Sequence, residues 1–327
     1  MSIISAAAIA AAAARIRASA ARTPLLDVSR HAGRPLRLKC ENLQVTGSFK
    51  YRGATSMISS LGPAETGNGV ITYSSGNHAQ AVACAARARG IPAVVVMPRT
   101  APAVKVEAAR TYGAEVLFEG TTSTERRARA EGEAERRGLT VVPPFDHPAI
   151  IAGQATVGRE IMEDAPEAAR VYVPIGGGGL LAGVASAVKL VRPAARVIGV
   201  EPAGAACMAA SLAAGRPVTL ESTASVADGL LPVRPGDLTF AVAQALVDEV
   251  VTVADDAIVG ALAWLCRYAK VVVEPSGAAA CAAALAAEPD PGNGETVAVL
   301  SGGNIALPAL AALIGSDIKD AIPARQR

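Results

Sequence analysis

Short apolar runs alternate with longer alanine-rich stretches along most of this chain. The runs are rich in valine, isoleucine and leucine, and each lies beside a stretch whose composition favours a helix. They predict strands at residues 36–40, 70–73, 93–97, 115–118, 171–174, 197–200 and 296–300. Strands that alternate with helices are typical of parallel sheets. The pattern therefore predicts an α/β fold in which parallel-type twisted sheets are flanked by helices.

A second, smaller unit is predicted inside the first. Residues 69 to 142 contain a strand and helix series of their own, and Pro143 and Pro144 break the chain directly after it. We therefore predict two lobes, with the smaller lobe inserted in the larger. The large domain is predicted to comprise residues 1–60 and 147–327, and the small domain residues 69–146.

Composition and charge exclude several classes of function. With 327 residues, 51% of them hydrophobic, the chain can bury a sizeable core. A formal net charge of +2 and 3% aromatic residues provide no basic, stacking surface, so we expect no nucleic-acid partner. The expected partners are small molecules.

The apolar opening of the chain could be a signal peptide, but an amphipathic helix is the better interpretation. The opening lacks a basic start, and Arg15, Arg17 and Arg22 follow it. No apolar run reaches the roughly 18 residues that cross a bilayer, so we expect no membrane partner. The five cysteines lack the spacing of disulfide frameworks or zinc sites. We expect a cytoplasmic location.

Lys50 is the first residue whose position suggests chemistry. It follows a polar turn after the strand at 36–40 and is predicted to lie in the first turn of a helix that begins near Ser48. The positive end of the helix dipole disfavours a second cation there and lowers the pKa of a lysine. A neutral amine is what Schiff-base chemistry requires. A solvated surface lysine is the alternative.

The turn after the strand at 70–73 combines groups that bind anions. Ser74, Ser75, Gly76, Asn77 and His78 bring hydroxyls, an amide and free backbone N–H groups together at the start of a helix. An ordinary helix cap is the alternative, since serine and asparagine are favoured there.

Four successive glycines, residues 176–179, join the strand at 171–174 to a helix. Because glycine has no side chain, the backbone N–H groups of such a loop can face a ligand directly. Phosphate-binding loops are built in this way. Each glycine costs folding entropy, so a purely structural run of four is disfavoured.

Ser301 follows the strand at 296–300, at the sheet edge where α/β proteins bind ligands. Taken alone, the segment Ser301-Gly302-Gly303-Asn304 is more typical of a turn.

Two nucleotide hypotheses compete for the glycines. A Walker loop is excluded because Gly-Lys-Ser/Thr is missing. Gly177, Gly179 and Ala182 match the dinucleotide pattern G-x-G-x-x-A, and Glu201 lies near the ribose-binding distance, so an NAD-dependent oxidoreductase is the alternative. That hypothesis leaves Lys50 and Ser301 without a role, whereas a phosphorylated aldehyde uses both. Pyridoxal phosphate is therefore favoured.

Six strings carry a resemblance that extends over nearly the whole chain: TGSFKYRGA, SSGNHAQAVA, MPRTAPAVK, PFDHPAIIAGQAT, PIGGGGLLAG and LSGGN. In this order they resemble the serine/threonine dehydratase and serine racemase family of pyridoxal-phosphate enzymes, which share the tryptophan-synthase β-subunit fold. The resemblance implies the two-lobed fold type II, with a large cofactor-binding domain and a small substrate-side domain. No C-terminal regulatory domain is expected.

The resemblance also implies a set of site residues. Those for the cofactor are Phe49, Lys50, Asn77, Gly176, Gly177, Gly178, Gly179, Leu180, Glu274 and Ser301. Lys50 would hold pyridoxal 5′-phosphate as a Schiff base and take the substrate's Cα proton, the glycines would bind the phosphate, and Phe49 would pack beside the ring. Asn77 would meet the ring hydroxyl and Ser301 the ring nitrogen. The substrate carboxylate would lie on Ser74, Ser75, Gly76, Asn77 and His78.

The reaction implied is the conversion of a small β-hydroxy amino acid, L-threonine or L-serine, to a 2-oxo acid and ammonia. A neutral hydroxyl at Ser301 does not hold a proton on the ring nitrogen, which favours elimination over transamination. Ser75 matches the second acid/base of family racemases, so serine racemisation stays open. Phe145 resembles the dehydratase form. Dehydration of 3-hydroxyaspartate, phenylserine or hydroxyectoine-pathway substrates also stays open.

At other positions the chain departs from the family pattern or leaves alternatives open. Glu201 and Ala205 match a divalent-cation site, but Cys207 replaces its aspartate, so we expect no metal and a salt bridge for Glu201. Glu274 could equally cap a helix. Arg126 aligns with a basic residue near the substrate, but a solvated helix face is favoured. By resemblance we expect a homodimer.

Overall fold

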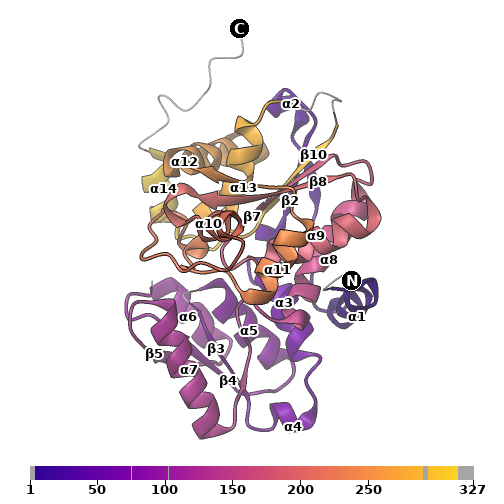
Figure 1. Cartoon of the computed structure of the whole chain (residues 1–327). Coiled ribbons are helices and arrows are strands. Elements are labelled where there is room, and N and C mark those ends of the chain that lie inside the picture. The colour runs from indigo at the N-terminus through magenta and orange to yellow at the C-terminus, as the bar shows by residue number, and fades with distance from the viewer. Residues whose placement is uncertain (1–3, 75, 102, 290–293, 316–327) are drawn as a thin grey trace.

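Two β-sheets organise the chain, of which the computed structural model describes residues 4–74, 76–101, 103–289 and 294–315. The larger sheet has the strand order β1-β2-β10-β7-β8-β9 and the smaller sheet the order β5-β4-β3-β6. Figure 1 shows the smaller sheet below the larger one. The larger sheet consists of β1 (Leu25–Asp27), β2 (Leu36–Cys40), β7 (Arg170–Pro174), β8 (Arg196–Pro202), β9 (Glu249–Val253) and β10 (Thr296–Leu300). The smaller consists of β3 (Val70–Tyr73), β4 (Ala93–Met97), β5 (Glu115–Phe118) and β6 (Thr140–Val141).

Strand pairing in both sheets is parallel, except that β1 runs antiparallel to β2. The prediction of parallel sheets flanked by helices is therefore confirmed. The strands β1, β6 and β9 were not predicted, because they are short or carry polar residues that weaken the apolar pattern.

Alternation along the strands separates the cores on the two faces of each sheet. In β7, Val171 and Val173 pack into one core of the larger sheet, whereas Tyr172 between them packs into the other. In β4, Val95 belongs to one core of the smaller sheet and Val94 to the other. Successive side chains of a strand point to opposite faces, so helices must cover both sides.

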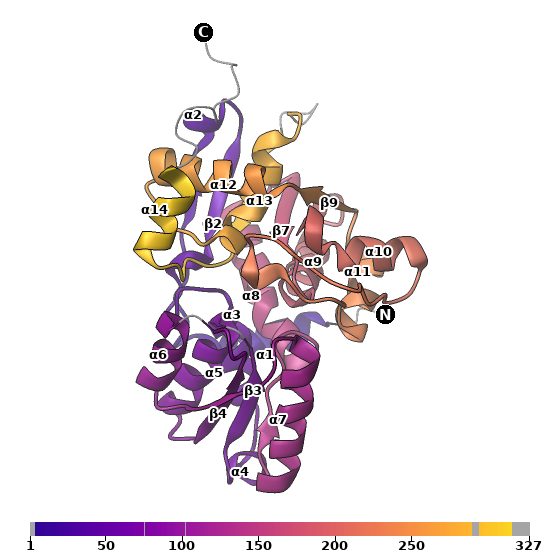
Figure 2. The same ribbon diagram turned by 90° about the vertical axis from the view of Figure 1, so that its left-hand side faces the viewer.

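Helices cover both sheets. Those near the larger sheet are α1 (Ala6–Ile16), α2 (Ser29–Ala32), α8 (Pro148–Asp164), α9 (Gly179–Val191), α10 (Cys207–Ala214), α11 (Asp237–Leu246), α12 (Asp255–Trp264), α13 (Pro275–Ala286) and α14 (Leu307–Gly315). Those near the smaller sheet are α4 (Pro63–Thr66), α5 (Asn77–Ala88), α6 (Ala103–Thr111) and α7 (Ser123–Arg137), with α3 (Lys50–Ile58) between the sheets. Figure 2 shows α5 and α6 on one face of the smaller sheet and α7 on the other.

The predicted amphipathic helix at the start of the chain is α1. Ile9, Ala12 and Ile16 are buried, and Ile9 and Ala12 share a core cluster with residues of α8. Within the described residues, no helix is both long and apolar enough to cross a membrane. The two sheets contain the strands expected of the two predicted domains, while the domain boundaries themselves stay a prediction.

Candidate active site at the carboxyl ends of the strands

The predicted loops converge where parallel strands of both sheets end. The backbone around Lys50 pairs with the segment after β10: Phe49 N–H donates to the Ser301 carbonyl over 3.1 Å, and Gly303 N–H to the Gly47 carbonyl over 2.9 Å. The glycine loop (Gly176, Gly177, Gly178 and Gly179) joins β7, the neighbour of β10, to α9. Binding sites of open α/β sheets lie at such an edge.

Lys50 begins α3 and points its amine toward the chain between the two sheets. Its Nζ donates a hydrogen bond of 2.7 Å to the Pro144 carbonyl and lies 5.1 Å from the centre of the Phe49 ring. Desolvation lowers the pKa of Lys50 from 10.5 to about 8. The predicted low pKa is therefore supported, but burial, rather than the expected helix dipole, is its cause. The amine is ready to react as a nucleophile near neutral pH.

The glycine loop is packed too closely for side chains. A Cβ atom on Gly177 would lie 2.3 Å from the Phe145 ring, and one on Gly176 would lie 3.0 Å from the Gly229 carbonyl oxygen. Gly178 has φ +94°, a conformation that favours glycine. The loop ends at Gly179, where the first N–H groups of α9, including that of buried Leu180, have no partner within the helix. Such N–H groups bind a phosphate well.

Asn77 is held between two side chains from the larger sheet. Its Nδ2 donates to Glu274, and its Oδ1 accepts a hydrogen bond of 2.9 Å from Asn304. Asn304 also donates to the Thr46 carbonyl, over 2.8 Å. Burial raises the pKa of Glu274 to about 7. The Glu274 carboxylate thus contacts Asn77 instead of capping α13, although Glu274 stands at the cap position.

Asn304 was not singled out as a site residue, although it closes the string LSGGN. Its neighbour Ser301 is buried, and the Ser301 hydroxyl donates a hydrogen bond of 3.3 Å to the Ser276 carbonyl. This bond fixes the hydroxyl at the carboxyl end of β10. Residues 301–304 form no turn, and Gly302 instead makes an isolated bridge with Ser48, while contact of Ser301 with a ligand stays a prediction.

The turn at 74–78 lies at the start of α5, as predicted, but its groups differ in availability. Ser74 Oγ accepts a hydrogen bond of 3.3 Å from the Gly76 N–H. His78 is buried, and its Nε2 contacts the Val142 carbonyl at 3.1 Å. Desolvation, aided by the charge of Lys50, lowers the pKa of His78 to about 3, so its ring is neutral. Ser75 lies outside the described residues.

Two expectations about charged residues are wrong. Glu201 is fully buried, and its carboxylate oxygens accept hydrogen bonds of 2.8 and 2.9 Å from the N–H groups of Met208 and Ala209 at the start of α10, instead of forming a salt bridge. Burial raises the pKa of Glu201 to about 7. Arg126 is 8% exposed and donates to the Thr121 carbonyl over 3.1 Å, so it does not lie on a solvated face. The local sequence does not indicate that the side chains of Glu201 and Arg126 are buried.

Among the described residues, no group of three or more His, Cys, Asp or Glu side chains is placed to hold a metal ion. Cys207 is buried beside Glu201, and burial raises the pKa of its thiol to about 12. A neutral thiol is a poor ligand for a hard cation. The expectation of no metal stays a prediction.

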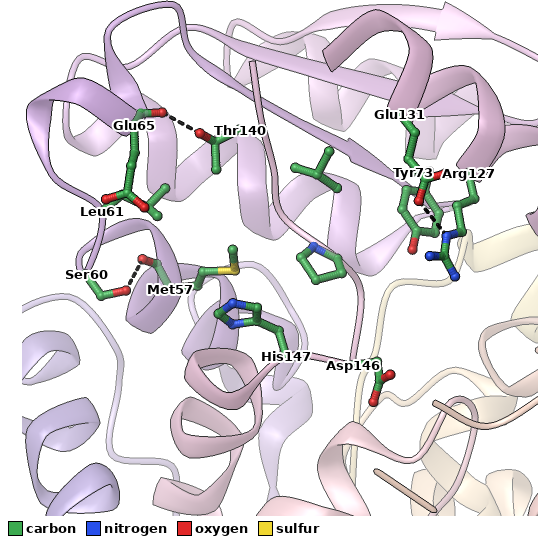
Figure 3. A pocket seen from close by; sticks show the side chains of 12 residues that line it. Met57, Ser60, Leu61, Glu65, Tyr73, Arg127, Glu131, Thr140, Asp146 and His147 are labelled. Atoms are coloured by element: carbon green, nitrogen blue, oxygen red, sulfur yellow. Dashed lines mark hydrogen bonds and ion pairs between the residues drawn. The ribbon is translucent and has the colours of Figure 1, made fainter. Parts of the chain in front are cut away.

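A cavity of about 480 Å³ lies behind one wall of this site (Figure 3). Tyr73 and Arg127 line one side of it, and Met57 and His147 lie opposite. Pro143, Asp146 and His147 border the cavity, while Pro144 and Phe145 between them contact Lys50 and the glycine loop. The cavity is thus separated from the reactive amine by one segment of chain.

Comparison with known proteins places this geometry in context. Residues 16–302 match the family model described as "Pyridoxal-phosphate dependent enzyme". The chain is 43% identical to an L-threonine ammonia-lyase of Geobacter sulfurreducens, over 92% of this chain and 75% of that protein. It is 45% identical to a catabolic L-threonine dehydratase of Escherichia coli, over 85% of each. The structure of maize serine racemase matches with a TM-score of 0.90 and 40% identity, covering 96% of this chain and 98% of that one.

Proposed function

This chain belongs to the family of pyridoxal-phosphate dependent enzymes, and from that premise we propose that it converts L-threonine or L-serine to a 2-oxo acid and ammonia. One observation carries the proposal: a lysine amine whose pKa burial lowers to about 8 lies where the glycine loop and Ser301 converge. Two relatives named L-threonine ammonia-lyase and L-threonine dehydratase, matched over 75% and 85% of their own lengths, support the same reaction.

The residues present fit pyridoxal phosphate. The glycine loop leaves no room for a Cβ at Gly177 and ends at a helix N-terminus, which suits a phosphate group. Among the described residues, the hydroxyl of Ser48 is buried without a hydrogen-bond partner beside Gly302, which suits a polar ligand. Lys50 offers the amine that holds the aldehyde, and Ser301 and Asn77 offer groups for the ring.

When bound, pyridoxal phosphate supplies a ring that withdraws electrons from the Cα of an amino acid. Lys50 would hold the cofactor through its amine, and Nζ of Lys50, when free, would accept the Cα proton of the substrate. The N–H groups of the turn at 74–78 hold the carboxylate and so orient the Cα–H bond toward Lys50. The neutral hydroxyl of Ser301 would favour elimination over transamination, and the β-hydroxyl would leave as water with the proton that Lys50 has taken from Cα. The released enamine hydrolyses in water to the 2-oxo acid and ammonia.

The dinucleotide hypothesis is set aside on two grounds. The family model covers residues 16–302, and the carboxylate of Glu201, which would have to bind a ribose, is buried and bonded to the N–H groups of α10. The Glu201 carboxylate is therefore not available to bind the ribose of a nicotinamide cofactor.

Serine racemisation is the second candidate, and the similarity to maize serine racemase favours it. The position of Ser75 in the sequence matches the second acid/base of such enzymes. Phe145, which resembles the dehydratase form, favours elimination, and its ring lies against Gly177 of the glycine loop. We also propose a cytoplasmic homodimer, which fits the five free thiols and can be tested by light scattering.

The function is tested by incubating the purified protein and pyridoxal phosphate with L-threonine, L-serine or their D forms. We expect equal amounts of 2-oxo acid and ammonia from the L forms, with 2-oxobutyrate from threonine and pyruvate from serine. Formation of D-serine without pyruvate would make racemisation the main activity. If no amino acid is changed, elimination is not the function.

The lowered pKa of Lys50 predicts how the apoprotein captures pyridoxal phosphate. Only the neutral amine reacts, and a pKa of about 8 leaves about a tenth of Lys50 neutral at pH 7, against roughly 1 in 3,000 for a solvated lysine. Capture, followed by visible absorbance, should accelerate with pH up to about 8 and then level off. Nα-acetyllysine, the control, should still accelerate above pH 10. A capture rate that behaves like this control would contradict the burial effect.

A further inference from the structure

One ion pair joins the segments of the two sheets at the edge of the site. Lys105 of α6, near the smaller sheet, forms a salt bridge with Asp228, the first residue of the 3-10 helix Asp228–Leu230 near the larger sheet. Lys105 is 8% exposed, whereas the Asp228 side chain is 47% exposed. Figure 2 shows α6 on the smaller unit, close to the larger one. A buried ammonium is costly unless it is paired.

The lysine end of the pair lies against the turn at 74–78. A Cβ atom on Gly76 would lie 2.7 Å from Cδ and 3.3 Å from Nζ of Lys105. Any side chain at Gly76 would therefore displace the lysine. The ammonium is thus packed on the backbone of the turn that is proposed to hold the substrate carboxylate.

The aspartate end is fixed to the cofactor side of the site. Gly229, the next residue, donates from its N–H to Ser276 Oγ over 2.9 Å, and the carbonyl of Ser276 accepts the hydroxyl of Ser301. The Gly229 carbonyl faces Gly176 of the glycine loop. Burial raises the pKa of Glu274 to about 7, and Lys105 and Asp228 shift it in opposite directions, so both charges lie within electrostatic range of the site.

We propose that the Lys105–Asp228 ion pair positions the start of α5, residues 76–78, over the cofactor site, so that the N–H groups of these residues meet the substrate carboxylate. Lys105 and Asp228 are positioning residues, and the inference rests on the proposed function because it assigns the carboxylate to this turn. Breaking the pair weakens substrate binding and leaves cofactor binding intact. A direct bond between Lys105 and the substrate carboxylate is the competing role.

The two roles predict opposite results for Asp228→Asn. If the pair positions the turn, Lys105→Met and Asp228→Asn each raise the KM for L-threonine by about threefold to fivefold, as expected for a partly exposed pair, with kcat within about twofold. The double variant is then no worse than either single variant, because both remove one interaction. If Lys105 binds the substrate directly, Asp228→Asn frees it, and KM stays unchanged or falls.

The experiment uses holoenzymes with matched cofactor absorbance. Lys189→Met is the control, because Lys189 makes a comparable ion pair with Asp248 away from the site. We also measure the dissociation constant of L-alanine, which has no β-hydroxyl to lose, from the change in cofactor absorbance. It should rise about threefold to fivefold in both single variants and not in the control.

The outcomes separate this inference from the proposed function. If the wild type forms 2-oxo acid but Asp228→Asn keeps its KM, the inference is overturned and the function stands. Additive effects in the double variant, or a fall in kcat in place of a rise in KM, also overturn it. If the wild type forms no 2-oxo acid, the proposed function fails, and the dissociation constants of L-alanine still decide whether the pair positions the turn.

Discussion

Lys50→Ala is expected to abolish 2-oxo acid formation, with a loss of about four orders of magnitude or more. The variant loses the amine that holds the cofactor and accepts the Cα proton, and no described side chain beside it offers another amine with a lowered pKa. Lys105, the nearby lysine, is paired with Asp228. The purified variant should lack the visible absorbance of the bound cofactor.

The fold of Lys50→Ala should survive, which makes the loss interpretable. Burying the charged ammonium of Lys50 costs free energy, and its removal relieves that cost. The variant loses the hydrogen bond to the Pro144 carbonyl in exchange. We expect a melting temperature within a few degrees of that of the wild-type apoprotein. Lys189→Met serves as the control with a lysine removed elsewhere. A Lys50→Ala variant that keeps the cofactor absorbance and turnover would refute the assignment of Lys50.

The parts of the site that the sequence predicts are those set by local chemistry. Four glycines between a strand and a helix predict an exposed helix N-terminus, and the structure places the glycine loop there. Lys50, Asn77 and Ser301 each follow a strand, or the turn after it, and the carboxyl ends of parallel strands meet at one edge. Their convergence therefore follows from strand order, which the alternation of strands and helices already suggests.

The parts that the sequence does not predict depend on partners distant along the chain. Glu201 was expected to form a salt bridge and Arg126 to lie on a solvated face, yet both are buried, because packing from other elements decides exposure. Asn304 and Asn77 bond to each other across 227 residues, and Lys105 pairs with Asp228 across 123. No periodicity or local motif encodes such pairs. The strand β9 was missed for a similar reason, since its partly polar sequence is held in place by pairing with β8, which lies about 50 residues earlier in the chain.

Gly177→Ala is expected to weaken binding of pyridoxal phosphate by one to two orders of magnitude. The added Cβ would lie 2.3 Å from the ring of Phe145, so either the ring or the glycine loop must move. Overpacking of this kind costs about 1 to 3 kcal/mol, and tenfold in affinity corresponds to about 1.4 kcal/mol. Titration of the apoprotein, followed by visible absorbance, measures the affinity. Gly132→Ala, in an open position within α7, is the control and should leave affinity unchanged.

The double variant Gly177→Ala/Phe145→Ala decides whether the Phe145 ring is the cause. If the ring and the new Cβ compete for one space, removing the ring should restore most of the affinity that Gly177→Ala loses, so the two changes are not additive. Phe145→Ala alone should keep the cofactor but relax the selection of the substrate's β-substituent, because the apolar wall is gone. If the double variant binds the cofactor no better than Gly177→Ala, the loop's own backbone, and not the contact with Phe145, requires glycine at this position.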